Sequence, residues 1–207
     1  INTTGYKRTR GEFTDLLYQM ERVHGIHNRG GEGVIPEGAQ VGLGARLAAI
    51  RTLNIQGPLS NTGNKLDVAI NGAGWFQVSG TDGETLFTRA GSFNTNATGQ
   101  MVTSDGYVVQ PAVTVPAGTT DIHINKTGQV FAHTAGVSEM TEIGQITLAD
   151  FANPAGLTAL GGNLFQVSDA SGPAVTGLPG AAGFGSVEQG YLEGSTITPL
   201  WLRDRKS

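Results

Sequence analysis

The stretch from Leu66 to Phe93 constrains the fold most strongly, because it divides into short apolar runs separated by glycines. In Leu66–Ile70 every second residue is a large aliphatic one, which is the period of a strand with one buried face. Gly72 and Gly74 then interrupt the run, as a bulge or a tight corner does. Short runs with turn residues between them continue along the chain, as is typical of sandwiches and barrels. The sequence therefore predicts an all-β domain, sandwich-like or barrel-like, of short strands joined by Gly-rich turns.

Turn chemistry predicts the hairpins of this domain. Asp105-Gly106 suits a two-residue turn of the primed type, because both positions tolerate positive φ, so residues 101–109 are expected to form a hairpin. The sequence around Asn125–Gly128 predicts a second hairpin, and Pro154 is expected to lie in a helical turn. The side chains expected to face the core are those of Phe76, Val78, Phe87 and Phe93.

The first 58 residues are expected to differ from the rest. Between Glu12 and Val23, apolar residues fall at i, i+3, i+4 and i+7, which predicts a short N-terminal helix that needs a partner surface. Residues 25–44 are rich in glycine and favour a loop or an extended ribbon. The predicted divisions are a connecting segment at 1–58, an all-β domain at 59–187, and a return strand with an atypical C-terminal tail at 188–207.

Composition excludes several classes of protein. Charged residues make up 14% of the chain and the formal net charge is −4, which argues against a general nucleic-acid binder. The lack of cysteine excludes disulfides, zinc thiolate sites and cysteine nucleophiles. No apolar stretch reaches the length of about eighteen residues that a membrane span needs, so no membrane insertion is expected.

Motifs that carry chemistry are sparse. His24 and His27 are three residues apart, but Glu21 is their one acidic neighbour, so solvated loop histidines are the favoured interpretation. Gly30–Gly33 lacks the Lys-Ser/Thr pair of a phosphate-binding loop. The position of Asp67 beside a strand predicts an acceptor that anchors a turn. We therefore predict no catalytic residue, no cofactor and no metal site.

Two interpretations concern residues that act in groups. Thr88-Arg89 and Asp67 are candidates for a structural pair. Asn96-Ala97-Thr98 and Asn125-Lys126-Thr127 fit the sequon for N-glycosylation, and chance accounts for both in a chain with this much Asn and Thr.

The short motifs occur together in one known family. The matching residues are Asp67–Ile70, Gly72, Gly74, Phe76–Val78, Thr88-Arg89, Gly91–Phe93 and Gln189–Glu193. In this order the chain resembles the axial proteins of the bacterial flagellum, which build its rod and hook, over roughly residues 2 to 196. The stretch 21–44 favours the distal rod members, which are similar in carrying an insertion after the element that is Leu16–Gln19 here.

The resemblance implies a structural subunit and no enzyme. Such subunits self-associate into a rigid tubular drive shaft that transmits torque. They contact other rod and hook proteins and the surrounding ring or bushing proteins. They lie in the flagellar basal body of the cell envelope and are exported without a cleaved signal peptide. Residues 23–40 would be the ribbon that stiffens the rod. The family's terminal polymerisation helices are missing from this sequence and Ile197–Ser207 departs from the pattern, so the chain alone is expected to associate weakly.

Two alternatives stay open from the sequence. The first is a hook or proximal-rod paralogue, of the same class but different stiffness. The second is a secreted all-β binding or adhesion module, for which the aromatic residues Trp75, Phe76, Tyr107 and Trp201 would form the platform.

Overall fold

The computed structural model describes Lys7 and residues 9–15, 18–20, 40–42, 45–52 and 55–195, with side chains for Lys7 and residues 55–195. Every regular element among them is a strand, apart from one 3-10 turn at Pro154–Gly156. The expected all-β class and the helical turn at Pro154 are confirmed. The chain divides into two compact units. We call Thr9–Thr52 the ribbon, and the unit formed by Ile1–Arg8 with Leu53–Ser207 the body.

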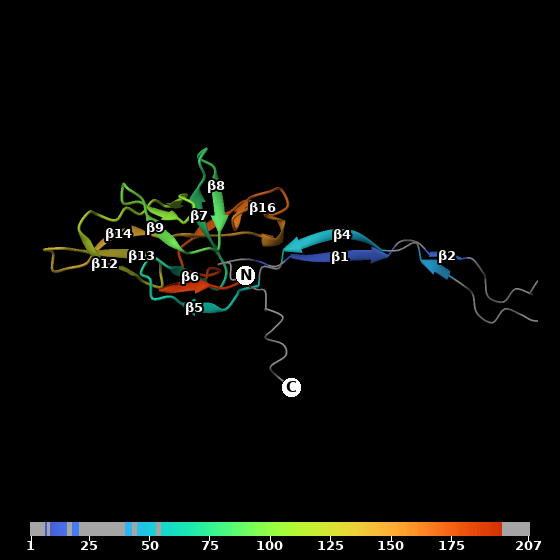
Figure 1. Cartoon of the computed structure of the whole chain (residues 1–207), viewed down its shortest axis with the longest axis horizontal. Coiled ribbons are helices and arrows are strands. Elements are labelled where there is room, and N and C mark those ends of the chain that lie inside the picture. The colour runs from blue at the N-terminus through green and yellow to red at the C-terminus, as the bar shows by residue number, and fades with distance from the viewer. Residues whose placement is uncertain are drawn as a thin grey trace, which may run out of the picture. The chain divides into compact units, whose positions relative to one another are not determined.

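The ribbon is a two-stranded antiparallel hairpin. Strand β1 (Thr9–Asp15) pairs with β4 (Ala45–Thr52), and β2 (Tyr18–Met20) pairs with β3 (Gln40–Gly42), as Figure 1 shows. The pair Tyr18↔Gly42 lies three residues beyond Asp15↔Ala45 on both strands, so the two ladders share one register. A β-bulge between Glu12 and Phe13 shifts the pairing once.

The helix predicted for Glu12–Val23 is wrong wherever the structure describes it. Glu12–Asp15 belong to β1 and Tyr18–Met20 form β2, while Leu16, Leu17 and residues 21–23 lie outside the described residues. A helix this short is marginal in water. Pairing with residues 45–52 satisfies the backbone instead, and helical periodicity does not reveal that distant partner. The ribbon predicted for 25–44 is confirmed at Gln40–Gly42, the part of it that is described.

A nine-stranded sheet organises the body. Its order is β16-β17-β8-β7-β11-β10-β9, with β15 pairing to β7 and β18 pairing to β15. The strands are β7 (Trp75–Ser79), β8 (Thr85–Thr88), β9 (Phe93–Thr95), β10 (Met101–Thr103), β11 (Val108–Gln110), β15 (Leu148–Asp150), β16 (Thr158–Gly161), β17 (Leu164–Gln166) and β18 (Val175–Gly177). In the body as drawn in Figure 1, β16 lies toward one end and β12–β14 toward the other.

Smaller sheets complete the body. One contains β12 (Thr119–Ile124), β13 (Gln129–Thr134) and β14 (Thr141–Gln145). Two strand pairs join the start of the body to its end: β6 (Val68–Asn71) with β19 (Ser186–Gln189), and β5 (Leu59–Asn61) with β20 (Tyr191–Glu193). The return strand is therefore built into the body by pairing with residues more than a hundred positions earlier.

Strand β7 is buried on both faces. Phe76 and Val78 belong to the larger of two apolar clusters. In this cluster the rings of Phe76 and Phe93 pack edge to face, with their centroids 5.1 Å apart. Trp75 belongs to the second cluster, which also holds Phe87 and Phe165. The four predicted core residues are each no more than 2% exposed, so that prediction is confirmed. The one-sided pattern predicted for residues 66–70 is wrong at both residues expected to face outward: Asp67 is 6% and Ala69 is 1% exposed, because this stretch is covered on both sides.

The turns differ from the prediction in type. The hairpin at 101–109 is confirmed, but only Gly106 of Asp105-Gly106 has a positive φ, +90°. Gly106 follows a tight turn in which its N–H donates to the Thr103 carbonyl, an arrangement typical of a three-residue loop with a bulge. The two-residue primed turn lies instead at Gly162 and Asn163 between β16 and β17, where φ is +58° and +60°.

Candidate functional site

A buried ion cluster, which we call the clasp, centres on the Glu193 carboxylate in β20. One oxygen, Oε1, accepts hydrogen bonds from Lys7 Nζ at 2.6 Å and from the Gly57 backbone N–H at 2.8 Å. The other, Oε2, accepts one from Arg89 Nε at 2.8 Å. The side chains of Lys7, Arg89 and Glu193 are 2%, 5% and 1% exposed. This geometry makes the clasp a charged centre that is buried within the body.

The two cations of the clasp also bind backbone carbonyls. Arg89 donates to the carbonyls of Gly72 at 2.9 Å and Gly74 at 2.6 Å, which hold the corner between β6 and β7. Lys7 donates to the carbonyl of Ile55 at 2.8 Å. No buried polar side-chain atom in the described part of the chain lacks a hydrogen-bond partner. A satisfied network of this kind fixes one arrangement of its segments.

Burial and charge act in opposite directions on the clasp. Burial raises the pKa of the Glu193 carboxyl, but Arg89, Lys7 and the Gly57 N–H together outweigh it, so the pKa lies below its usual range. Burial lowers the pKa of Lys7, and the hydrogen bond and charge of Glu193 oppose that change. The carboxylate is therefore held ionised at neutral pH, and its charge is needed by both cations.

The clasp joins residues of the body that lie, in the sequence, just before and just after the ribbon. Lys7 precedes β1, while Ile55 and Gly57 follow β4. Glu193 lies on the return strand, 136 positions after Gly57 and 186 after Lys7. One carboxylate therefore ties three distant segments together, which is a structural arrangement.

Sequence reasoning found only part of the clasp. Asp67 anchors a turn as predicted, since its carboxylate accepts from Thr62 Oγ1 at 2.6 Å and Asn64 Nδ2 at 3.1 Å. The predicted pair of Arg89 with Asp67 is wrong, because Arg89 binds Glu193. Lys7 and Glu193 were missed. The signal available in the sequence was the scarcity of basic residues, since Arg89 is one of three Lys or Arg residues between positions 55 and 195.

The other candidates do not assemble into a site. His123 is exposed, and His133 Nδ1 lies 3.0 Å from Thr120 Oγ1. His24, His27, Glu21 and Gly30–Gly33 lie outside the described residues. Within the described ranges, no group of three metal-binding side chains occurs and no helix is long and apolar enough to cross a membrane.

The aromatic platform of a binding module is not present as predicted. Trp75 is 3% exposed and Phe76 is fully buried, so neither ring can stack on a ligand. Tyr107 is half-buried, and Trp201 lies outside the described residues.

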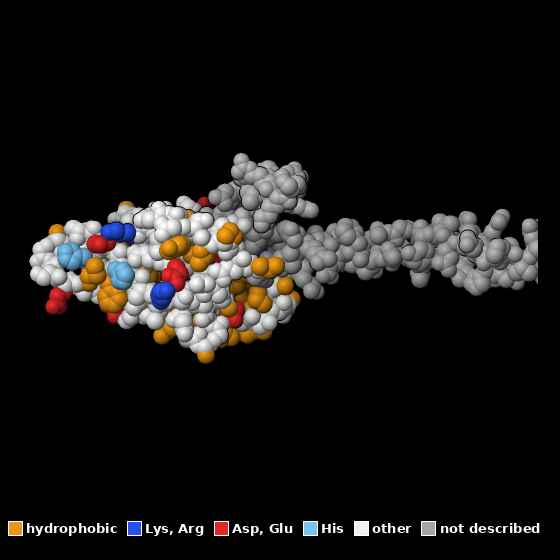
Figure 2. All heavy atoms as spheres, turned by 90° about the horizontal axis from the view of Figure 1, so that it is seen from below, with side chains coloured by type: hydrophobic (Ala, Val, Ile, Leu, Met, Phe, Trp, Pro, Cys, Tyr) orange, Lys and Arg blue, Asp and Glu red, His pale blue; other side chains and the backbone are white. Residues whose placement is uncertain are grey.

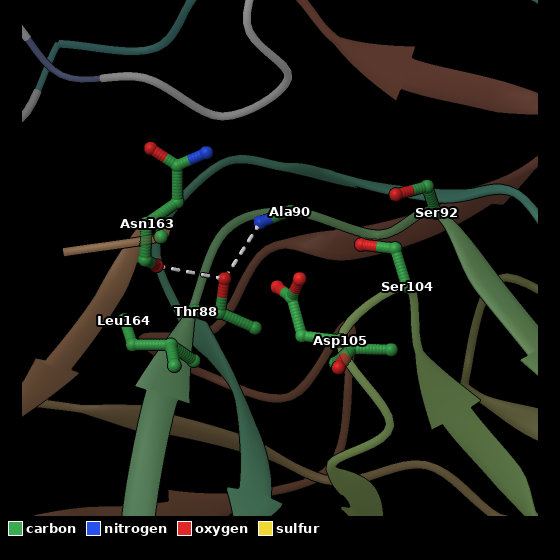
Figure 3. Close-up of a pocket in the computed structure, with 9 residues that line it drawn as sticks. Thr88, Ala90, Ser92, Ser104, Asp105, Asn163 and Leu164 are labelled. Carbon is green, nitrogen blue, oxygen red and sulfur yellow. Dashed lines mark hydrogen bonds between the residues drawn. The ribbon is translucent and has the colours of Figure 1, made fainter.

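A polar cavity of about 260 Å³ lies where three loops meet. Its lining comes from the end of β8, the β10–β11 turn and the β16–β17 turn, as Figure 3 shows. Thr88 Oγ1 braces the wall by donating to the Asn163 carbonyl at 2.9 Å and accepting from the Ala90 N–H at 3.0 Å. Ser92, Ser104 and Asp105 face the same space.

Comparison with known proteins gives one consistent family. A family profile described as the flagellar hook protein FlgE/F/G D1 domain matches residues 69–132, which include β7 to β11. The chain is 54% identical over 197 residues to the flagellar basal-body rod protein FlgG of Agrobacterium fabrum, covering 95% of this chain and 75% of that protein. It is 44% identical to the FlgG of Caulobacter vibrioides, with the same coverage of both proteins.

A hook protein matches less of the chain. The flagellar hook protein FlgE of Helicobacter mustelae is 40% identical over 111 residues, which is 53% of this chain and 24% of that protein. The match to FlgG of the more distant Borreliella burgdorferi is also 40% identical, but it covers 96% of this chain and 75% of the relative. Identity sustained over nearly the whole chain is what decides membership: this chain belongs to the FlgG family of flagellar basal-body rod proteins.

Proposed function

We propose that this chain is a structural subunit of the distal rod of the flagellar basal body. Many copies associate side by side into a rigid tubular drive shaft that transmits torque. The observation that carries the proposal is the alignment with FlgG proteins over 95% of the chain, ribbon included. A body whose distant segments are tied by a buried ion cluster suits a part that bears load without chemistry.

The finer details of this role follow from the same proposal. The subunit self-associates in the axial polymer and contacts other rod and hook proteins and the surrounding ring or bushing proteins. It lies in the periplasmic part of the basal body and reaches it without a cleaved signal peptide. The proposed functional divisions are 1–58, 59–187 and 188–207. Within the first division, residues 23–40 are the part of the ribbon that stiffens the rod. No cofactor or catalytic residue is part of the proposal.

The test is to locate the chain in purified flagella. Deleting its gene from the native cell should remove motility and leave basal bodies without a distal rod in electron micrographs. The restored wild-type gene with a small epitope should return the rod, and immunogold should label it. Label on the hook instead would make the chain a hook paralogue. Label on the cell surface away from basal bodies would make it a binding module.

A further inference from the structure

We infer that Asn71-Gly72 is a latent deamidation site that Gln56 and the clasp hold closed in the folded body. Asn71 is the only Asn in the sequence that is followed by Gly. Asn is a chemically labile residue, and a following Gly brings no side chain that could shield the peptide nitrogen or restrict its rotation. The inference concerns the body alone and does not depend on the proposed rod.

The reaction needs only water and the two residues themselves. The backbone nitrogen of Gly72 loses its proton to solvent and attacks Cγ of Asn71. The bond from Cγ to the side-chain nitrogen breaks, and that nitrogen takes up a proton from solvent and leaves as ammonia. Water then opens the cyclic imide at one of its two carbonyls, which gives Asp or isoaspartate. Either product carries a new negative charge, and isoaspartate also lengthens the main chain by one methylene group.

The Asn71 side chain is open to this reaction. Asn71 is the last residue of β6, and it is exposed. Its side chain makes no hydrogen bond with any residue of the described ranges. Most of the described surface in Figure 2 is backbone or uncharged polar side chain, so no screen of charged groups covers that face. Protection of the pair must therefore come from the peptide nitrogen.

The fold requires Gly at position 72, so the labile pair is built into the structure. Gly72 has a φ of +115°, a conformation that residues with a Cβ rarely adopt. A Cβ there would lie 2.9 Å from Gly185 Cα, which is too close. The Gly185 N–H donates to the Ala73 carbonyl at 2.7 Å and keeps the two segments together.

Gln56 holds the nitrogen that would attack. Its Oε1 accepts from the Gly72 N–H at 2.8 Å, and its Nε2 donates to the Ile70 carbonyl at 3.2 Å. The side-chain amide thus pairs with residues 70 and 72 as the backbone of a neighbouring strand would. Before the nitrogen can reach Cγ, this hydrogen bond must break, and the extended backbone of Asn71, which pairs with Ser186, must rotate.

The clasp fixes Gln56 from both sides. Lys7 binds the carbonyl of the residue before it, and Glu193 binds the N–H of the residue after it. Arg89, the third charged group of the clasp, donates to the Gly72 carbonyl at 2.9 Å. Opening the clasp would therefore release the protecting side chain and the protected peptide together.

The test follows residue 71 by mass spectrometry. The purified chain and its variants are incubated at mildly alkaline pH, with and without urea, and then digested. The Asn, Asp and isoaspartate forms of the peptide are separated and counted. Gln56→Ala removes the protecting group. The matched control is Gln145→Ala, because Gln145 is also half-buried and its Nε2 also donates to a backbone carbonyl, that of Thr127 at 2.6 Å.

In the wild-type chain, Asn71 should deamidate more slowly without urea than with it. Gln56→Ala should raise the rate without urea about five-fold, the factor that the loss of one hydrogen bond gives, and Gln145→Ala should leave it unchanged. Equal wild-type rates with and without urea, or equal rates in these two variants, would overturn the inference. Glu193→Gln should also raise the rate, and an unchanged rate would overturn the part assigned to the clasp.

A second measurement needs no variant. Hydrogen exchange of the wild-type chain should show a slow Gly72 amide, because Gln56 accepts its hydrogen bond. A Gly72 amide that exchanges as fast as in the unfolded chain would overturn the inference, whether or not Gln56→Ala folds.

Discussion

Glu193 carries the single negative charge that two buried cations share. Replacing it by Gln keeps the shape but leaves Lys7 and Arg89 without a counterion, so Glu193→Gln should lower the free energy of unfolding of the body by about 3–5 kcal/mol. Urea titration of the purified chain measures this loss. The matched control is Glu188→Gln, whose partner Lys126 is 74% exposed and which should cost about 0–1 kcal/mol. Equal losses in the two variants would show that the clasp does not stabilise the body.

The same residue makes stability depend on acidity. Although burial raises the pKa of Glu193, its cationic partners lower it below the ordinary value of 4.5. A carboxyl with a lower pKa in the folded than in the unfolded chain stabilises the fold above the unfolded value, and that contribution is lost as the pH falls through the folded value. The urea midpoint of the wild-type chain should therefore fall between about pH 5 and about pH 3. The curve for Glu193→Gln should be flatter, and parallel curves would contradict the assignment.

Two hairpins of the body use one and the same turn sequence, Asn-x-Thr-Gly-Gln. In each, the Asn side-chain oxygen accepts from the Thr N–H, the Thr hydroxyl and the Gln N–H, and the Asn amide donates to the Gln side chain. The turns are Asn96–Gln100 between β9 and β10 and Asn125–Gln129 between β12 and β13. These contacts give the Asn and Thr of the two sequons a structural role in their turns. The two sequons are therefore not explained by chance, as the sequence alone had suggested.

The paired turns predict matched effects. Asn125→Ala and Asn96→Ala should each lower the free energy of unfolding by about 1–2 kcal/mol, because two backbone N–H groups lose their acceptor. Asn→Asp at either position keeps that acceptor and should cost less. Lys126→Ala in the same turn removes only an exposed ion pair and should change stability by less than about 1 kcal/mol. The measurement is urea unfolding, and a larger effect of Lys126→Ala would refute this account of the turn.

The elements show how far the sequence could predict the structure. Alternation and turn residues located the strands around Phe76, Phe87 and Phe93, since these signals are local. The prediction of a helix at Glu12–Val23 was wrong because the helical spacing of apolar residues does not reveal a strand partner at residues 45–52. The sequence did not predict the clasp for the same reason, since Glu193 and Arg89 are 104 positions apart in the chain. Local chemistry predicts an element, whereas the choice of a distant partner depends on the assembled fold.

At the scale of the whole molecule, the ribbon contrasts with the body. Its strands pair with each other, and an isolated two-stranded hairpin is at best marginally stable in water. The body has its own core clusters and its own clasp. This contrast favours a ribbon that acts in the polymer, where neighbouring subunits can cover it and lose their freedom to slide.

Shortening the ribbon tests that role. Residues 16–44 can be replaced by Asn-Gly, because Asp15 and Ala45 are already cross-strand partners and a two-residue primed turn closes such a pair. In the full-length protein, the shortened chain should still be incorporated but should give curved, hook-like rods in electron micrographs. The purified body should unfold at the same urea concentration as before. Glu193→Gln is the converse control, which weakens the body while leaving the ribbon complete, and should give fewer but straight rods. Straight rods from the shortened chain would reject the stiffening role, and an unfolded body would mean that residues 16–44 belong to its fold.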